Sequence, residues 1–222
     1  MNVTAENMTK EYIRPGRGTN RFAAVNGVSL TLEGGNLCAV MGRSGSGKTT
    51  LLNILAGLLS PTSGKVLIDG RDIYSLDDKT LSRLRCESFG VVPQGQSAVQ
   101  TLTVEENILL PFTLYGEKCD AEYARELMER LGISELASVK PAELSGGELR
   151  RMAIARAVIR RPGVIFADEP TGDLDDENTA LVFGFLKQLA REGNTVMVVT
   201  HENEAVKYAD RVLKMNSGKL TE

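Results

Sequence analysis

Short, continuous apolar runs alternate along this chain with longer segments in which apolar residues recur at helical spacing. The runs are short enough for strands, and their lack of polar alternation indicates strands buried on both faces. They occupy Leu37–Met41, Phe89–Val92, Val164–Asp168 and Thr195–Thr200. Buried strands that alternate with helices predict an α/β fold whose parallel sheet is covered on both faces.

After the first run, apolar residues recur at helical spacing between residues 51 and 58, which predicts a helix. The apolar stretch 104–115 belongs to a mostly helical block, although Pro111 interrupts it. Further helices are predicted over 76–84, 120–131, 144–161, 178–191 and 202–208. Strand-like pieces are expected from residue 3 to about 32, with a turn-rich break at 14–20, and at 65–70 and 211–215.

A glycine-rich loop lies between the first buried strand and its helix. Residues 42–50 read Gly-Arg-Ser-Gly-Ser-Gly-Lys-Thr-Thr and fit the pattern G-x-x-x-x-G-K-[ST] at every fixed position. Glycines let successive backbone N–H groups point into one concavity that holds phosphate oxygens, and the helix N-terminus adds positive charge there. In this motif Lys48 reaches the β- and γ-phosphates and Thr49 offers its hydroxyl to Mg²⁺. An ordinary glycine turn is disfavoured because the flanking strand and helix are both present.

Two more polar clusters follow apolar strands directly. Asp168 ends one strand, and His201, the only histidine, follows another. Because the carboxyl ends of parallel strands meet at one sheet edge, both clusters should converge on the glycine-rich loop. Asp168 then suits Mg²⁺, and Glu169 could polarise the water that attacks the γ-phosphate. The alternative is an Asp-Glu-Pro turn that only ends the strand.

Residues 144–148, Leu-Ser-Gly-Gly-Glu, allow two interpretations. Ser145 and Glu148 have the spacing of a capping box before a helix. A cap does not require two glycines, however, and glycine weakens a helix. Gly146 and Gly147 suit a position where a ligand approaches the backbone, so this helix N-terminus is predicted to be a second anion site.

This segment resembles the signature motif of the ATP-binding-cassette (ABC) family. From about residue 3 to its C-terminus, the chain resembles the nucleotide-binding subunit of an ABC transporter. Its phosphate loop is 42–49 and its second nucleotide motif is 164–168. Gln94 matches the family's Q-loop, Glu169 its catalytic glutamate, Asp175 the end of its D-loop, and His201 its switch histidine.

The resemblance implies a P-loop NTPase (RecA-like) parallel-sheet core with an N-terminal antiparallel β subdomain and an inserted helical subdomain. The core and β subdomain would comprise about 1–94 and 159–222, and the helical subdomain about 95–158. Catalysis would involve Glu169, His201 and Lys48. Mg²⁺ would be held by Thr49, Gln94 and Asp168. ATP would be bound by Tyr12, Gly42, Ser44, Gly45, Ser46, Gly47, Lys48, Thr49, Thr50, Gln94, Ser145, Gly146, Gly147, Glu148 and Asp175.

The family pattern also implies partners. Two copies would face head to tail, so that the signature of one closes over the ATP held by the other, and a separate transmembrane permease would be driven by this cycle. Tyr12 would stack on adenine, with Phe22 as the competing aromatic residue. After Gln94 the segment 95–100 is more polar than in many relatives, and Arg150 and Arg151 follow the signature where many relatives carry glutamine.

The overall pattern resembles the branch that serves lipoprotein release, macrolide efflux and antimicrobial-peptide export or sensing. The alternative is the cell-division cassette of the same branch, which transmits a mechanical signal without a cargo. DNA-repair and translation ATPases are disfavoured, because repair members split their motifs with a long coiled coil and translation members carry two cassettes. A P-loop kinase has no use for the signature.

Composition and charge restrict the partners and the cellular compartment expected for the protein. A net charge of −3 with mixed signs argues against a surface built for nucleic acid. Three scattered cysteines suit a reducing compartment without a zinc site. With no apolar run long enough for a span and no signal peptide, a soluble chain at the cytoplasmic face of the membrane is expected. The arginines at 150, 151, 156, 160 and 161 are predicted to form a solvated helix face.

Overall fold

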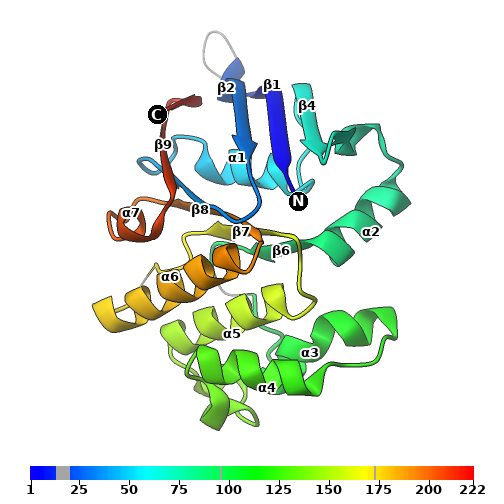
Figure 1. Ribbon diagram of the computed structural model, residues 1–222, viewed down its shortest axis with the longest axis vertical. Coiled ribbons are helices and arrows are strands. Elements are labelled where there is room, and N and C mark those ends of the chain that lie inside the picture. Colours follow the sequence, from blue (N-terminus) through cyan, green and yellow to red (C-terminus); the bar gives the residue numbers. More distant parts are fainter. Residues whose placement is uncertain (14–20, 96, 173) are drawn as a thin grey trace.

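The computed structural model describes residues 1–13, 21–95, 97–172 and 174–222. Its upper part in Figure 1 is an antiparallel sheet with the strand order β2-β1-β4-β5. These strands are β1 (Val3–Ile13), β2 (Arg21–Leu32), β4 (Ser63–Ile68) and β5 (Arg71–Asp72). The break predicted at 14–20 lies outside the described residues. The strand-like pieces predicted before residue 33 are confirmed on either side of it.

The second sheet is the centre of the molecule and has the order β10-β9-β3-β8-β7-β6. All its neighbouring strands pair in parallel except β9 with β10. Its members are β3 (Leu37–Met41), β6 (Phe89–Val92), β7 (Val164–Asp168), β8 (Thr195–Thr200), β9 (Arg211–Asn216) and β10 (Lys219–Thr221). The four buried strands predicted from continuous apolar runs are confirmed with the same bounds.

Helices cover both faces of the parallel sheet, as the apolar runs require. In β7, Val164 and Phe166 pack toward α1 (Lys48–Leu55) and the antiparallel sheet. The alternate residues Ile165 and Ala167 pack toward α5 (Gly146–Val158) and α6 (Asp176–Arg191). Side chains alternate across a strand, so each strand contributes to both cores. α1 therefore lies between the two sheets (Figure 1).

The remaining helices lie mainly at the lower end of the view in Figure 1. α3 (Val104–Tyr115) continues through Pro111, with a capping box from Thr103 and Glu106 at its start. α4 (Ala121–Arg130) packs beside α3 and α5, whereas α2 (Asp78–Ser88) and α7 (Ala205–Tyr208) are near the central sheet. Single 3-10 turns occupy Ile73–Ser75, Ser134–Leu136 and Pro141–Glu143. The division into a core and a helical subdomain at 95–158 stays a prediction.

Several predicted bounds differ from the observed ones. The helix expected at 144–161 is shorter because Ser145 caps it and it ends at Val158, and the one expected at 76–84 begins after the cap residue Asp77. β5 and β10 were not predicted, because two or three residues are too few to show an alternating pattern.

The prediction of a solvated arginine face is wrong for Arg151, Arg156 and Arg160, whereas the side chain of Arg161 is 59% exposed. Arg151 is only 8% exposed and donates to Asn178 in the first turn of α6. Arg156 donates to Ser97 and Asn107, and its burial lowers its pKa. Arg160 and Arg161 form ion pairs with Glu117 and Asp120 at 2.8 and 2.7 Å. These guanidinium groups join α5 and the residues after it to neighbouring segments, which charge spacing alone does not reveal.

Candidate functional site

The glycine-rich loop joins β3 to α1 and requires glycine at two positions. Gly47 has φ +108°, and a Cβ there would lie 2.0 Å from the Ala24 carbonyl oxygen. A Cβ on Gly42 would lie 2.5 Å from the Met215 carbonyl oxygen. α1 begins directly at Lys48, and its first turn has no acidic residue and no side-chain cap. Its N-terminal N–H groups are therefore available to an anion.

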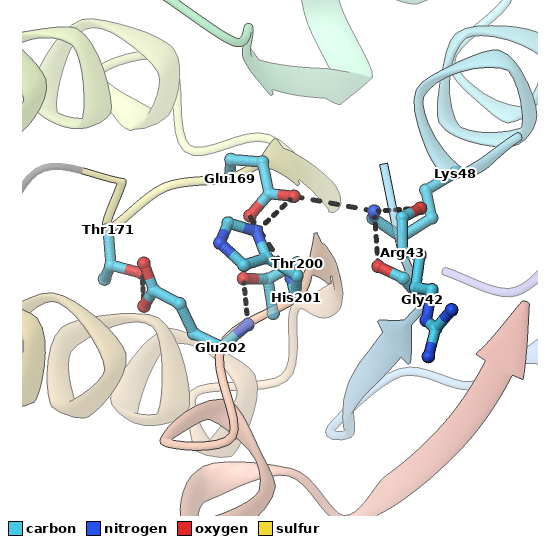
Figure 2. Close-up of polar contacts among 8 residues, drawn as sticks. All are labelled: Gly42, Arg43, Lys48, Glu169, Thr171, Thr200, His201 and Glu202. Atoms are coloured by element: carbon cyan, nitrogen blue, oxygen red, sulfur yellow. Dashed lines mark hydrogen bonds and ion pairs between the residues drawn. The ribbon is translucent and has the colours of Figure 1, made fainter. Parts of the chain in front are cut away.

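Lys48 is held inside this loop by the chain itself (Figure 2). Its Nζ donates to the Gly42 and Arg43 carbonyl oxygens at 2.8 and 3.3 Å. The same Nζ lies 3.6 Å from Glu169 Oε1, and the lysine side chain is only 7% exposed. The ammonium group is thus enclosed by partial and full negative charges, in a position to meet a phosphate at the loop.

Glu169 follows β7 in a strained backbone conformation. Its φ is +46°, which non-glycine residues rarely adopt, and its N–H donates to Val199 O at 2.8 Å. Both carboxylate oxygens lie 3.1 Å from His201 Nδ1, and the His201 N–H donates to Oε2 at 3.3 Å. The strained turn therefore directs the carboxylate toward both Lys48 and His201, as Figure 2 shows.

Burial opposes the charge of Glu169 and by itself raises its pKa. Hydrogen bonds from His201 and Thr200, together with the positive charge of Lys48, outweigh burial and bring the pKa below its ordinary value. The group is therefore an ionised carboxylate at neutral pH, the form that can accept a proton.

Asp168 is in the opposite electrostatic situation. It is 2% exposed, and burial raises its pKa although the Thr49 side chain hydrogen-bonds it. Its Oδ1 has no hydrogen-bond partner among the described residues. A buried carboxylate oxygen without a donor is costly, so this position suits a cation that the chain does not itself supply.

These groups surround a cavity of about 830 Å³. Tyr12 and Phe22 form one wall, with ring centroids 5.6 Å apart and planes 25° apart. Gln94, Glu169 and His201 form the wall beyond the loop. The cavity thus combines a phosphate-binding end, an aromatic surface and a carboxylate, and its size suits a nucleotide.

The structure brings most of the predicted site residues together but leaves one group apart. Those that line the cavity are Tyr12, Ser44, Gly45, Gly47, Lys48, Thr49, Thr50, Gln94, Glu169 and His201. Gly42 and Ser46 shape the loop without lining it, and Asp168 lies behind it, where its carboxylate meets the Thr49 side chain. The predicted residues outside the cavity lining are Ser145, Gly146, Gly147, Glu148 and Asp175.

The separate group surrounds the N-termini of two helices. The capping box of α5 is present, because Glu148 Oε2 accepts from the Ser145 N–H at 2.7 Å and the Glu148 N–H donates to Ser145 Oγ. A Cβ on Gly146 would meet no atom within 4 Å, so this glycine faces open space. Asp175 caps α6 and accepts from the Asn178 N–H at 2.8 Å. The helix N-terminus of α5 is therefore both capped and accessible.

Some residues of the site carried no recognisable signal in the sequence. Arg43 lines the cavity and its carbonyl anchors Lys48, yet it occupies a variable position of the motif. Thr171 and Glu202 contact one another close to Glu169 and His201. They lie three and two residues after the ends of β7 and β8, and that spacing does not mark them as partners.

Within the described ranges, no group of three or more His, Cys, Asp or Glu residues could hold a metal ion. No helix in the described part of the chain is long and apolar enough to cross a membrane.

A glycine-rich loop at the carboxyl edge of a parallel sheet, with an acidic pair at the end of β7, one strand removed from β3, defines a P-loop nucleotide-binding protein. A family model described as "ABC transporter" matches residues 25–172. The chain belongs to this family.

Curated relatives extend the likeness over the whole chain. An uncharacterized ABC transporter ATP-binding protein of Methanocaldococcus jannaschii, MJ1508, is 39% identical and covers 99% of this chain and 98% of its own length. The lipoprotein-releasing system ATP-binding protein LolD of Xanthomonas campestris pv. campestris is also 39% identical, with 99% and 92% covered. The macrolide export ATP-binding/permease protein MacB of Aggregatibacter actinomycetemcomitans is 37% identical, and this chain spans 34% of it.

Solved structures agree with these relatives. The dimeric structure of the ABC transporter cassette MJ0796 superposes with a TM-score of 0.91 at 34% identity, covering 99% of this chain and 97% of the cassette. A dimeric post-hydrolysis state of the same cassette with ADP and Pi has a TM-score of 0.90. The chain is accordingly an ATP-binding and ATP-hydrolysing motor subunit of the ABC transporter family.

Proposed function

We propose that Glu169 is the general base of ATP hydrolysis in this motor subunit. The observation that supports this most directly is the ionised carboxylate held 3.6 Å from Lys48 Nζ and 3.1 Å from His201 Nδ1 at the wall of the cavity. A base must stand within reach of the water it activates, and Lys48 marks where phosphate oxygens bind. His201 orients the carboxylate and directs the rest of its exposed ring toward the nucleotide.

Mg²⁺ fits the oxygen donors behind the loop. Asp168 Oδ1 is buried without a partner, and the Thr49 side chain lies beside the same carboxylate. With Gln94 these groups would supply oxygen ligands of the kind that Mg²⁺ prefers. Bound there, the ion supplies positive charge that neutralises the phosphate oxygens.

The aromatic wall is the proposed adenine surface. Tyr12 stacks against Phe22, and Lys10 Nζ lies 5.6 Å from the centroid of the Tyr12 ring. Because both rings line the cavity, a purine can stack on either one, and Tyr12 remains our assignment.

Each ATP is proposed to lie between two copies of the chain. Ser145, Gly146, Gly147 and Glu148 lie outside the cavity lining of their own copy, and the glycine that faces open space leaves the α5 N-terminus free to approach a phosphate. The N-terminus of α5 would close over the partner's ATP, with Asp175 at the same interface. This arrangement gives two equivalent sites in a symmetric dimer.

The cargo and the location are inferred from the names of relatives. LolD belongs to a lipoprotein-releasing system and MacB to macrolide export. We assign this motor to export or extraction of a lipoprotein, peptide or drug, with the subunit at the cytoplasmic face of the membrane.

Replacing Glu169 with glutamine tests the catalytic assignment. Glu169→Gln keeps the size of the side chain but removes the base, so turnover should fall about 10²–10⁴-fold. ATP binding should persist, and the ATP-bound dimer should accumulate and be visible by size-exclusion chromatography. Glu122→Gln, at an exposed position of α4, is the matched control and should turn over ATP normally. Wild-type turnover in Glu169→Gln would contradict the proposal.

A further inference from the structure

A second contact joins the two loops that carry Glu169 and His201. Thr171 lies two residues after Glu169, and its Oγ1 donates to the carboxylate of Glu202, which directly follows His201. Figure 2 shows this contact on the side of the loops away from Lys48. The two loops are therefore tied twice, once through Glu169 and His201 and once through Thr171 and Glu202.

His201 depends on such ties because core packing does not hold it. Its side chain is 66% exposed, whereas that of Glu169 beside it is 11% exposed. The backbone after His201 is fixed at Glu202, whose N–H donates to Thr200 Oγ1 at 3.1 Å. With its N–H bonded to Thr200 and its carboxylate bonded to Thr171, Glu202 limits where the imidazole of the preceding His201 can lie.

The Thr171 contact is not needed to shape its own turn. Backbone hydrogen bonds from Gly172 N to Glu169 O, at 3.2 Å, and from Leu174 N to Thr171 O, at 3.0 Å, already form that turn. Thr171 is nonetheless 1% exposed, and its hydroxyl is directed to the other loop. A buried hydrogen bond to a carboxylate is strong, and its loss would leave the Glu202 carboxylate without this donor.

We propose that Thr171 and Glu202 are positioning residues that hold His201 against Glu169 during ATP hydrolysis. Neither residue lines the nucleotide cavity, so they act through His201. This inference rests on the proposed role of Glu169 as general base. The contact fixes the relative position of two loops that enter the site from different strands, β7 and β8.

Two variants at position 171 separate the hydroxyl from the volume of the side chain. Thr171→Val fills the same space without a donor, and Thr171→Ser keeps the donor. We expect Thr171→Val to lower kcat about tenfold or more, the scale of a hydrogen bond to a charged group. KM for ATP should stay within about twofold, because the phosphate loop and the aromatic wall are untouched. Thr171→Ser should retain the wild-type kcat.

Glu202 gives the reciprocal test. Glu202→Ala removes the acceptor and should reproduce the loss of kcat seen in Thr171→Val, while Glu202→Gln keeps an acceptor oxygen and should lose less. The double variant Thr171→Val/Glu202→Ala should be no slower than either single variant, because both remove one contact. If Thr171→Val fails to fold, Glu202→Ala and Glu202→Gln decide the question, since Glu202 is only partly buried.

Three results would overturn the inference. These are a wild-type kcat in Thr171→Val or Glu202→Ala, an equal loss in the valine and serine variants, or a change in KM alone. Glu169→Gln, measured in parallel, separates this failure from that of the proposed function. If Glu169→Gln is inactive while Thr171→Val is normal, only the positioning role fails. If Glu169→Gln turns over normally, the general base itself is wrongly assigned.

Discussion

Asp168 carries a carboxylate where burial opposes its charge. Its Oδ1 finds no donor in the described structure, and its pKa is raised in consequence of burial. A carboxyl group with a raised folded pKa binds its proton more readily in the folded state. Folding stability therefore falls as the pH rises through that pKa. In the nucleotide-free protein at neutral pH, this side chain destabilises the fold.

Asp168→Asn removes that charge and should stabilise the nucleotide-free protein. In the presence of EDTA at pH 7, we expect its melting temperature to exceed the wild-type value by about 2–4 °C. The difference should shrink as the pH is lowered and Asp168 becomes protonated. The extra stabilisation that wild type gains from ATP with Mg²⁺ should be absent in the variant. Asp78→Asn, at an exposed position, is the control. An equal or lower melting temperature for Asp168→Asn would contradict this reasoning.

Sequence patterns identified individual residues best where chemistry restricts the residue type. The loop lysine, the acidic pair and the single histidine each had few alternatives, and the structure places Lys48, Glu169 and His201 around one cavity. The contact between Thr171 and Glu202 could not be predicted, because both residue types are common after strands. Only the relative position of two loops, which depends on the whole sheet, makes them partners.

Helix α5 carries the signature at its N-terminus and also makes hydrogen bonds to the segment that contains Gln94. Arg150 Nη1 donates to Pro93 O at 2.8 Å, just before Gln94. Two turns further along, Arg156 donates to Ser97 and to Asn107, a fully buried side chain of α3. The helix that begins with the signature is thus joined to both sides of Gln94.

Arg156→Met should destabilise the protein more than the same substitution at Arg150. Methionine keeps much of the aliphatic stem at either position. At 156 it removes a partly buried donor to Ser97 and Asn107, although Asn107 Oδ1 still accepts from the Val99 N–H, so we expect a loss of about 1–3 kcal/mol in the free energy of unfolding. At 150 the partner is an exposed carbonyl that water can reach, and the loss should be smaller. Denaturant unfolding of both variants measures the difference, and equal losses would show that burial of Arg156 has no energetic role.

At this scale the sequence predicted strands better than helix faces. β3, β6, β7 and β8 had the expected bounds because a strand buried on both faces is a continuous apolar run. The arginines of α5 were misread, since charge at helical spacing does not show whether a partner element covers it. α3 continues through Pro111. Its bounds are set by the capping box of Thr103 and Glu106 at its start and by the left-handed cap at Gly116 at its end.

The whole chain presents two separate functional surfaces, the cavity and the N-terminus of α5. In the proposed dimer these surfaces face each other, and a substitution at Gly146 would disturb their contact without disturbing the monomer fold. Its Cβ would enter open space, unlike that of Gly147, which would lie 2.9 Å from Leu174. The monomer fold therefore does not explain why residue 146 is glycine.

Gly146→Asp should leave the isolated chain folded and able to bind ATP, but it should not dimerise. The new carboxylate would face the partner's phosphates, and such repulsion should lower turnover at least about 100-fold. Analytical ultracentrifugation with ATP, in the Glu169→Gln background, measures the dimer directly. Gly184→Asp places the same residue at another helical glycine with open space and should dimerise normally. A stable dimer of Gly146→Asp would exclude α5 from the interface.

The enclosure of Lys48 has a consequence for the choice of ligand. Its charge faces two carbonyl oxygens and the Glu169 carboxylate of its own chain. An incoming anion must compete with this internal counter-ion, and a lone inorganic phosphate makes too few other contacts to do so well. A nucleotide adds its ring stacking and further phosphates to the competition. The internal partners of Lys48 therefore favour nucleotides over small anions at the loop.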